Sequence, residues 1–517
     1  MSGNLKNRYL LVLKSLSKVE IKNQLGFGRI AKGAFYLYIS TLITSVLGYV
    51  FWFIVSKLTS PNIVGLASTA VTIATIAHAF TMLGIPTGIQ RFLGKAYAKN
   101  DTNILKSYFT TGFTILTLTS GFFACILIFL SGWLANFTGL PVTLLIVAGL
   151  LTFTSSIYPI FYALFISTLQ TKLIMYVNLS ASISRLTVGI LLILAGLGAL
   201  GIMLGYLTLS IISLAAYLIL TLKFIGPPKP NFNLKRGVEL FKAGSVNWLP
   251  AIISILGLQL GVLVVYGFHG AFQAGLYFIA YAIAGIVLAI PSSLFGVMFP
   301  VLSGMEDGRE KASWKATKLT LTIVVPIALA LTVYSKNILS FFGPNYIDAW
   351  LPLTILLIAV APFAMVQGVN ILAYASGLYS LVLILGVSIS LPRTLLYIVL
   401  TPLFGGVGAA EAFLAGTITG LVCMVYIGKK IGAILDGYSL ALIFLPPSII
   451  GVILYLVDVW WIVGVPLILA VSLFIYTRLK IMDKKDVEEV ARSFLSEKMF
   501  KVGVEKFSWI IRILYGE

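Results

Sequence analysis

The sequence predicts an all-α membrane protein, with two pseudo-symmetric six-helix bundles, two further helices and about 14 transmembrane helices in all. Its mean hydropathy is +1.03 and only 10% of its 517 residues are charged, against roughly 25% in soluble domains. The apolar residues form about fourteen runs long enough to cross a bilayer. Landmarks in the first six runs return, in the same order, in the next six.

The composition excludes several classes of function. The net charge of +19 comes from basic residues in short segments between apolar runs, which is typical of membrane topology and not of a nucleic-acid-binding surface. The two cysteines, Cys125 and Cys423, lie in separate apolar runs and form neither a disulfide framework nor a metal-ligand spacing. With only two histidines besides, we expect no metal site, no cofactor and no nucleic-acid partner.

Residues 1–30 precede the first apolar run and carry basic residues throughout. They contain no apolar core followed by a small-residue cleavage site, so they do not read as a signal peptide. Apolar side chains recur at helical spacing, at Leu5, Tyr9, Val12 and Leu16. We expect a cytoplasmic amphipathic helix on the inner membrane face, and a disordered basic tail is the alternative.

The apolar runs give the expected helices in order. An N-terminal six-helix bundle over 31–222 has spans at 31–56, 62–87, 108–135, 141–169, 173–197 and 200–222. A C-terminal six-helix bundle over 244–430 has spans at 244–267, 274–300, 317–342, 350–375, 379–402 and 406–428. Two additional transmembrane helices are expected within 439–480.

Two polar segments complete the predicted organisation. Residues 223–243 form the longest polar connection and include Gly226, Pro227 and Pro228, which break helices, so we expect a cytoplasmic linker there. Residues 481–517 mix charged and apolar side chains, which predicts a cytoplasmic amphipathic tail.

The distribution of Lys and Arg predicts the orientation. If the N terminus is inside, all of these residues but four lie in segments on the inner side. The exceptions are Lys57 and Lys336 in outer segments and Arg185 and Arg393 within spans. We therefore expect a multi-pass protein of the cytoplasmic membrane with both termini in the cytoplasm.

An internal repeat relates the two bundles. Gly65-Leu66 matches Gly275-Leu276, Ile85-Pro86 matches Ile290-Pro291, Arg185 matches Arg393, and Gly201 matches Gly408. These pairs have nearly equal separations and keep their order along the chain. Each copy has an even number of spans, so the two share one orientation, with an axis along the membrane normal.

Several glycine and proline motifs resemble those of polysaccharide-biosynthesis flippases in the multidrug/oligosaccharidyl-lipid/polysaccharide (MOP) exporter superfamily. They are Lys32-Gly33-Ala34, Lys57-Leu58-x-Ser60-Pro61-x-x-x-Gly65-Leu66, Leu83-Gly84-Ile85-Pro86-x-Gly88-Ile89-x-Arg91-Phe92 and Gly405-Gly406-Val407-Gly408-Ala409-Ala410. The resemblance implies a MATE-like fold of 12–14 helices that moves lipid-linked oligosaccharides across a membrane by alternating access. Relatives that handle a lipid-linked peptidoglycan precursor carry several arginines in the first spans, whereas the first span here offers only Lys32.

Two arginines deep in apolar runs are the main candidates for substrate binding. A charge at bilayer depth costs roughly 2.5–3.5 kcal/mol on insertion scales. Arg185 shares a helical stripe with Asn178 and Ser182, which are further substrate-binding candidates, and Arg393 follows Pro392 at similar depth. Because a guanidinium meets phosphate oxygens bidentately, we expect both arginines to bind the diphosphate of a lipid-linked sugar. The alternative is a structural role, with bonds to carbonyls or to an acid such as Glu411.

Other polar residues within or beside the spans have two interpretations each. Gln367 and Asn370 could contact sugar hydroxyls or bond neighbouring helices. Arg91 could form a phosphate gate or belong to the charged membrane surface. Glu411 and His78 are candidates for coupling to H⁺ or Na⁺, and a hydrogen bond between helices is the other interpretation of His78.

The leading hypothesis is a lipid-linked oligosaccharide flippase, whose partners are its glycan substrate, membrane lipids and glycosyltransferases of the same pathway. A cation-coupled multidrug or metabolite exporter on the same fold is the first alternative. A membrane enzyme, such as a sugar polymerase or ligase, is the second. We do not expect an enzyme, because the outer segments are short and hold only Lys57 and Lys336 as basic residues.

Overall fold

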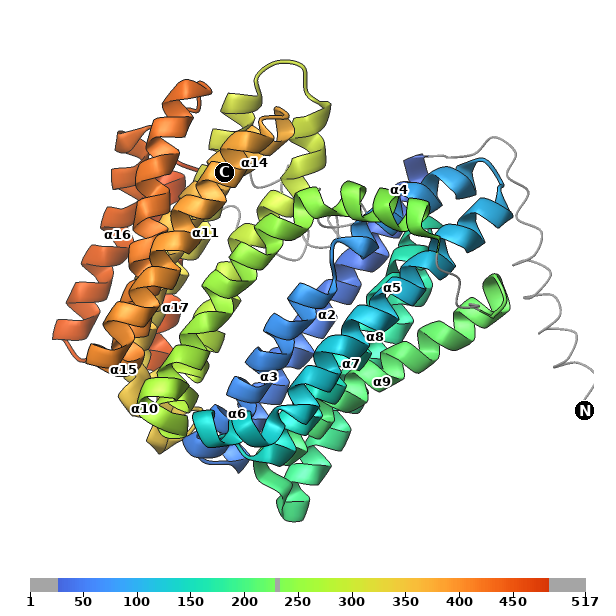
Figure 1. Cartoon of the computed structure of the whole chain (residues 1–517). Coiled ribbons are helices and arrows are strands. Elements are labelled where there is room, and N and C mark those ends of the chain that lie inside the picture. Colours follow the sequence, from blue (N-terminus) through green and yellow to red (C-terminus); the bar gives the residue numbers. More distant parts are fainter. Residues whose placement is uncertain (1–26, 228–232, 483–517) are drawn as a thin grey trace, which may run out of the picture. The chain divides into compact units, whose positions relative to one another are not determined.

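The computed structural model describes residues 27–227 and 233–482 (Figure 1). These residues form helices joined by short turns, with no strand among them. The all-α membrane fold predicted from the sequence is thereby confirmed. Residues 483–517 of the predicted amphipathic tail at 481–517 and most of the predicted N-terminal segment at 1–30 lie outside the described residues.

Contacts between residues divide the chain into two compact units. Unit 1 consists of the described residues of Met1–Val55 and Ile73–Leu249, and unit 2 of those of Ser56–Thr72 and Pro250–Glu517. The helices α2 (Phe27–Leu58), α3 (Pro61–Thr81) and α10 (Leu234–Gly304) contribute to both.

The other helices belong to one unit each. Unit 1 contains α4 (Ile85–Ala98), α5 (Thr102–Phe129), α6 (Ser131–Thr138), α7 (Val142–Ser167), α8 (Thr171–Leu192), the π-helical turn η1 (Ile193–Leu197) and α9 (Gly198–Phe224). Unit 2 contains α11 (Arg309–Val333), α12 (Ser335–Ser340), the 3-10 turn η2 (Pro344–Ala349), α13 (Trp350–Ile358), α14 (Val360–Ala375), α15 (Tyr379–Lys430), α16 (Gly437–Leu456) and α17 (Trp461–Arg478).

Eleven continuous helical stretches in the described residues are long and apolar enough to cross a membrane. Three of them, Thr171–Phe224, Leu234–Gly304 and Tyr379–Lys430, are 54, 71 and 52 residues long. Each bends at glycines with non-helical backbone angles and therefore holds two crossings. The described chain thus has the 14 crossings that the apolar runs predict.

Two of these bends repeat the same unusual backbone conformation. Gly198 has φ 49° and ψ −122°, and Gly405 has φ 58° and ψ −135°, a region that side chains disfavour and glycine adopts freely. The spacing that relates Gly201 to Gly408 also relates these two glycines. The two halves therefore share a backbone feature as well as a sequence pattern.

The core of unit 1 is formed by apolar side chains from α4, α5, α7, α8, α9 and the start of α10. Its fully buried members include Phe109, Phe161, Leu164, Tyr217 and Leu240. At about 25 cal/mol per Å² of apolar surface buried, such large side chains dominate the packing. Helices in a bilayer also approach closely where small residues meet: a Cβ added to Gly205 would lie 3.0 Å from the Cα of Gly189.

The second predicted span, 62–87, is interrupted in the structure. Helix α3 ends at Thr81, and Leu83 and Gly84 have φ values of 46° and 70° before α4 begins. Pro86 lies at the start of the new helix, where the missing N–H costs nothing. Gly84 also allows a close crossing, because a Cβ placed on it would lie 2.4 Å from the carbonyl carbon of Gly244.

The start of α10 is fixed to unit 1 by polar contacts. This helix begins at Leu234, within the predicted connection 223–243. The indole N–H of Trp248 donates to the carbonyl of Ala79 at 2.8 Å, and the hydroxyl of Tyr108 donates to the carboxylate of Glu239. These bonds bind the first turns of α10 to α3 and α5.

In unit 2, two glycines that the sequence repeat matches, Gly65 and Gly275, lie where two helices approach each other closely. A Cβ on Gly65 would lie 1.8 Å from the carbonyl oxygen of Ala271, and one on Gly275 would lie 2.0 Å from that of Pro61. The two matched glycines therefore allow α3 and α10 to meet backbone to backbone.

The last two helices pack on α11, which also contacts α13 and α14 (Figure 1). Tyr334 at the end of α11 donates to the carbonyl of Val459 at 3.1 Å, between α16 and α17. The Asp436 side chain accepts the N–H of Tyr438 and caps α16.

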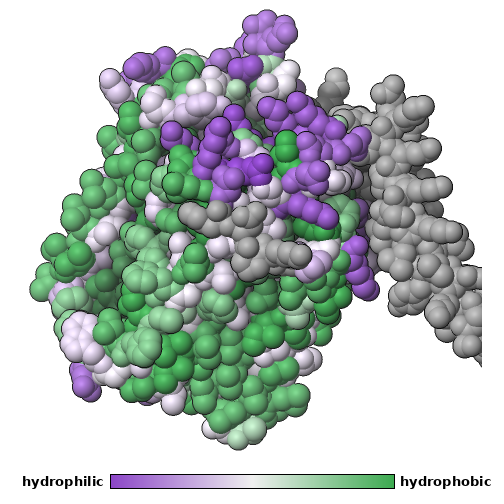
Figure 2. All heavy atoms as spheres, turned by 45° about the vertical axis from the view of Figure 1, so that its right-hand side comes forward, coloured by the Kyte–Doolittle hydropathy of each residue, from purple (hydrophilic) through white to green (hydrophobic). Residues whose placement is uncertain are grey.

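The surface agrees with a membrane environment. Figure 2 shows hydrophobic residues over most of the visible face and hydrophilic residues gathered toward its upper end. Exposed apolar side chains of this number, among them Phe122, Leu191 and Tyr426, exceed what a protein in water presents.

Candidate functional site: two buried arginines

Arg185 lies in the second half of α8 and is only 8% exposed. Its guanidinium lies over two rings, with its Cζ 5.3 Å from the centroid of Phe51 and 5.0 Å from that of Tyr206. Its Nε is buried without a hydrogen-bond partner, and no described residue of unit 1 forms an ion pair or hydrogen bond with its side chain. The rings stabilise the cation, but its N–H donors remain uncommitted.

Three helices build this environment. Phe51 and Trp52 come from α2, Arg185 from α8 and Tyr206 from α9. The Phe51 and Tyr206 rings meet edge to face with centroids 5.9 Å apart, and the indole N–H of Trp52 donates to the Tyr206 hydroxyl at 2.8 Å. A Cβ on Gly48 would lie 3.2 Å from Nη2 of Arg185, so this glycine leaves room for the guanidinium.

Arg393 lies in the first half of α15 and is 3% exposed. Its Cζ lies 3.8 Å from the centroid of the Phe413 ring, and its Nη2 donates to Oγ1 of Thr417 at 2.9 Å. A Cβ on Gly416 would lie 2.5 Å from the Cβ of Arg393. This arginine is closely packed and has a polar partner, although its Nε also lacks one.

The two environments are related by the internal repeat. The spacing that matches Gly201 to Gly408 also matches Tyr206 to Phe413 and Ser210 to Thr417. Each arginine therefore lies over an aromatic ring at the equivalent position of its own unit. The halves differ in the polar groups: Ser210 shares a 2.6 Å hydrogen bond with Thr154 and leaves Arg185 without a hydroxyl partner.

Glu411, the acid considered in the alternative structural role of Arg393, does not pair with it. Both residues lie in unit 2, and no ion pair joins Glu411 to Arg393 or to another described residue of that unit. Glu411 is half-buried in α15.

Asn178 and Ser182 lie on α8 on the N-terminal side of Arg185. Asn178 donates to Oγ of Ser40 at 3.1 Å and accepts from the hydroxyl of Tyr217 at 3.3 Å. Ser182 is buried, at 3% exposure. The Asn178 bonds connect α2, α8 and α9, and they hold in register the three helices that surround Arg185.

The candidates Gln367, Asn370 and Arg91 lie on helices other than those of the two arginines. Asn370 donates to Oε1 of Gln367 on the same helix, α14, at 3.4 Å, and both side chains are half-buried. Arg91 is exposed on α4, with its guanidinium 5.8 Å from the centroid of Phe92.

His78 lies near the end of α3 and bonds to another helix. Its Nδ1 is 3.1 Å from Oγ of Ser156 on α7. The hydroxyl of Thr81 donates to that same serine oxygen at 2.7 Å. These contacts agree with the interpretation of His78 as a residue that links helices.

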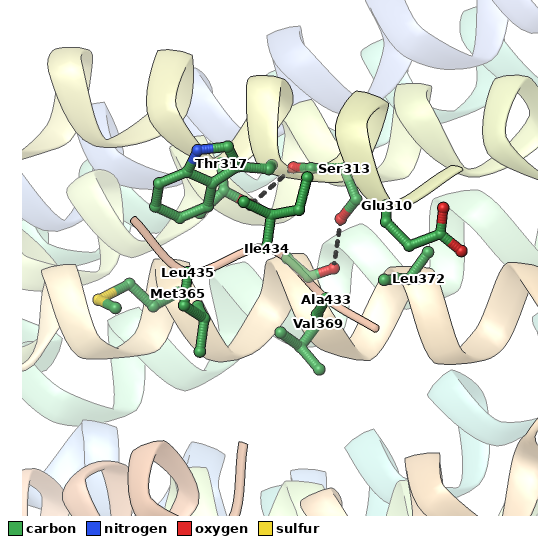
Figure 3. Close-up of a pocket in the computed structure, with 11 residues that line it drawn as sticks. Glu310, Ser313, Thr317, Met365, Val369, Leu372, Ala433, Ile434 and Leu435 are labelled. Atoms are coloured by element: carbon green, nitrogen blue, oxygen red, sulfur yellow. Dashed lines mark hydrogen bonds between the residues drawn. The ribbon is translucent and has the colours of Figure 1, made fainter. Parts of the chain in front are cut away.

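A pocket in unit 2 is too small for a substrate. Figure 3 shows it between α11, α14 and residues 433–435, with Glu310, Ser313 and Thr317 among its lining residues. Its volume is about 10 Å³, which is close to the space for one water molecule. Ser313 donates to the carbonyl of Gly368 at 3.0 Å, so the pocket belongs to the packing of α11 on α14.

The sequence interpretation found both arginines but missed the groups around them. Phe51, Trp52 and Tyr206 around Arg185, and Phe413 and Thr417 around Arg393, were not among the candidates. The repeat contained a usable signal, because an aromatic residue stands at the same place in both halves. Trp52 and Phe51 had no such signal, since their approach to α9 depends on how the helices pack.

Comparisons with solved structures identify the fold. The lipid II flippase MurJ in an inward-closed conformation matches with a TM-score of 0.69 and 17% identity, over 86% of this chain and 99% of the other. An inward-facing multidrug resistance MATE transporter of the MOP superfamily matches with a TM-score of 0.58 and 14% identity, over 77% and 98%. A mutant of the Vibrio cholerae MATE transporter VcmN gives 0.52 and 15%, over 78% and 97%.

Sequence comparison gives the family. No curated protein matches the sequence. A family model described as "Polysaccharide biosynthesis protein" matches residues 54–354, more than half of the chain. The chain shares the fold of these flippase and MATE transporter structures, and it belongs to the polysaccharide biosynthesis protein family.

Proposed function

We propose that the protein is a flippase that moves lipid-linked oligosaccharide or polysaccharide precursors across the cytoplasmic membrane by alternating access. The family description supports a place in polysaccharide biosynthesis, and the fold supports transport. The observation that carries the proposal is Arg185, a buried guanidinium whose N–H donors have no described partner within its unit.

An uncommitted cation at this depth requires a physical reason. Taking a charge out of water costs several kcal/mol unless partners offset that cost, so stability alone does not account for Arg185. A phosphate or diphosphate supplies the acceptor oxygens that the site lacks, and charge-assisted bonds to them are roughly twice as strong as neutral ones. Lipid-linked sugars of polysaccharide pathways carry such a group between lipid and glycan.

The other candidates take subsidiary roles in this proposal. Arg393 is the pseudo-symmetric counterpart of Arg185 and contributes positive charge from the second half. Gln367 and Asn370 contact sugar hydroxyls, and Arg91 receives phosphate at the inner face. Asn178 and Ser182 support the Arg185 helix. Residues 31–222 and 244–430 form the two bundles that alternate, joined by the cytoplasmic linker at 223–243, and both termini lie in the cytoplasm.

Cation-coupled export of drugs or metabolites is the second candidate. The observation in its favour is Glu411, a half-buried carboxylate in a membrane-spanning helix without an ion-pair partner among the described residues of unit 2. Intramembrane carboxylates commonly carry protons or ions. His78 is less suited to coupling, because it already bonds to Ser156.

Reconstitution into vesicles distinguishes the two functions. The full-length chain is tested with a fluorescent lipid-diphosphate oligosaccharide and, separately, with a cationic dye, each with and without a proton or sodium gradient. Flipping of the lipid-diphosphate sugar without dye export is the expected result. Gradient-driven export of the dye with no movement of the lipid-linked sugar would contradict the flippase proposal.

A further inference from the structure

We infer that the Tyr206 hydroxyl, oriented by Trp52, is a second phosphate-binding donor beside Arg185. This inference rests on the proposed function and specifies the chemistry of its binding site. It assigns Tyr206 to direct contact with the substrate and Trp52 to positioning.

The hydrogen bond between Trp52 and Tyr206 can run in one direction only, and that direction decides where the Tyr206 hydroxyl hydrogen points. An indole N–H is a donor only, so in its 2.8 Å contact with Trp52 the Tyr206 oxygen must accept. The Tyr206 hydroxyl hydrogen is then directed elsewhere, and no described residue of unit 1 accepts it. Tyr206 is half-buried, so packing does not enclose its side chain completely.

The same ring supports the arginine. The guanidinium carbon of Arg185 lies 5.0 Å from the Tyr206 centroid, so the hydroxyl and the guanidinium belong to one small site. Phe51 lies on the guanidinium as well, at 5.3 Å. Rings at this range leave the in-plane N–H groups of an arginine available, and those groups meet phosphate oxygens in pairs. Arg185 and Tyr206 together thus offer a cation and a neutral donor to one phosphate group.

The arginine of the second half has a different set of polar groups around it. Phe413 stands where Tyr206 would be and has no hydroxyl. Thr417 then supplies a hydrogen-bond acceptor to Arg393 at 2.9 Å. In unit 2 the arginine is partly satisfied within the protein, whereas in unit 1 both donors remain uncommitted. The uncommitted donors that this inference assigns to the phosphate therefore lie in the first half.

A binding assay with four proteins tests the role of the hydroxyl. Wild type, Tyr206→Phe, Arg185→Gln and the control Tyr176→Phe are purified full-length in detergent and titrated with farnesyl diphosphate by calorimetry. Tyr206→Phe keeps the ring over Arg185, and Tyr176 is an exposed tyrosine on α8. We expect Tyr206→Phe to weaken binding about tenfold, as for the loss of a hydrogen bond to a charged group, and Tyr176→Phe to change nothing.

A double-mutant cycle tests the role of Trp52. Trp52→Phe should weaken farnesyl diphosphate binding in the wild type and have no further effect in Tyr206→Phe, because it acts only through that hydroxyl. Equal effects in both backgrounds would show a purely structural role and overturn the positioning claim. Unchanged thermal midpoints of the variants establish that they are folded.

Further probes separate the source of the phosphate. Farnesol, which lacks the diphosphate, should bind equally to wild type and Tyr206→Phe. Inorganic pyrophosphate should show the same Tyr206 dependence as farnesyl diphosphate. Binding of pyrophosphate as tight as that of farnesyl diphosphate supports a site for free phosphate groups, and tighter binding of the lipid supports a headgroup site.

The outcomes also separate the inference from the proposed function. If farnesyl diphosphate binds wild type and Tyr206→Phe equally while Arg185→Gln loses it, the Tyr206 inference is wrong and the flippase proposal stands. If wild type binds no diphosphate and flips no lipid-diphosphate sugar, both fail.

Discussion

Arg185 and Arg393 have matched positions in the repeat but different surroundings. Arg393 lies 3.8 Å from the Phe413 centroid and bonds to Thr417, so most of its interactions are made within the protein. Arg185 has only ring contacts on its guanidinium. A charge that the fold leaves unpaired is a cost in the empty state and a source of affinity when an anion arrives.

This difference predicts opposite effects on stability. Arg185→Met should leave the thermal midpoint of the detergent-solubilised protein at or above that of wild type, because it removes an unpaired buried charge. Arg393→Met should lower it, since about 1–2 kcal/mol of hydrogen bonding and cation–π contact are lost. Differential scanning fluorimetry measures both midpoints, and an equal drop in the two variants would contradict the assignment.

The sequence was enough to single out the two buried arginines, but it did not indicate which residues contact them. Arg185 and Arg393 are conspicuous in the sequence because placing a charge within an apolar membrane span has a high free-energy cost, whichever way the side chain faces. Their partners depend on tertiary packing: Phe51 reaches Arg185 from α2, more than a hundred residues away in the chain. In the alternative structural role of Arg393 its partner was an acid such as Glu411, whereas in the structure the hydroxyl of Thr417 accepts the hydrogen bond.

Among the elements, apolar length predicted the spans and glycines marked the bends. The runs at 173–197 and 200–222 appear as one helical stretch that turns at Gly196 and Gly198. The break within the predicted span 62–87 was not predicted, because the length of an apolar run carries no information about backbone angles such as the positive φ values of Leu83 and Gly84. The Gly84-Ile85-Pro86 sequence contained the signal, since proline favours the first turn of a new helix.

The reciprocal contact of α3 with α10 predicts which glycines tolerate a side chain. Gly65→Ala and Gly275→Ala should each destabilise the protein by about 1–3 kcal/mol or more, because the new methyl overlaps backbone atoms that cannot move aside. Gly267→Ala is the control, since a Cβ there meets no atom within 4 Å. Yield of folded protein and thermal midpoint measure the effect; tolerance of Ala at Gly65 would refute the close approach.

The internal repeat and the Lys and Arg distribution together predict one membrane topology, in which the two halves have the same orientation and both termini are cytoplasmic. Two copies with an even number of spans share an orientation, and the glycine bends at Gly198 and Gly405 recur in both. The orientation itself remains a prediction from the Lys and Arg distribution.

Cysteine labelling tests the topology. In a Cys125→Ser/Cys423→Ser background, Asn100→Cys should be protected from a membrane-impermeant maleimide in intact cells and labelled after permeabilisation. Asn337→Cys should be labelled in intact cells, because it lies beside Lys336 on the predicted outer side. Both asparagines are exposed in the structure. The reverse labelling pattern would invert the topology.

The initial rate at which reconstituted protein flips a lipid-diphosphate oligosaccharide tests whether Arg185 binds the transported diphosphate. We expect measurable flipping by wild type, a loss of at least about tenfold for Arg185→Gln, and a smaller loss for Arg393→Gln, whose side chain already donates to Thr417. An Arg185→Gln variant that is folded and flips at the wild-type rate would contradict the claim that this arginine binds the transported diphosphate.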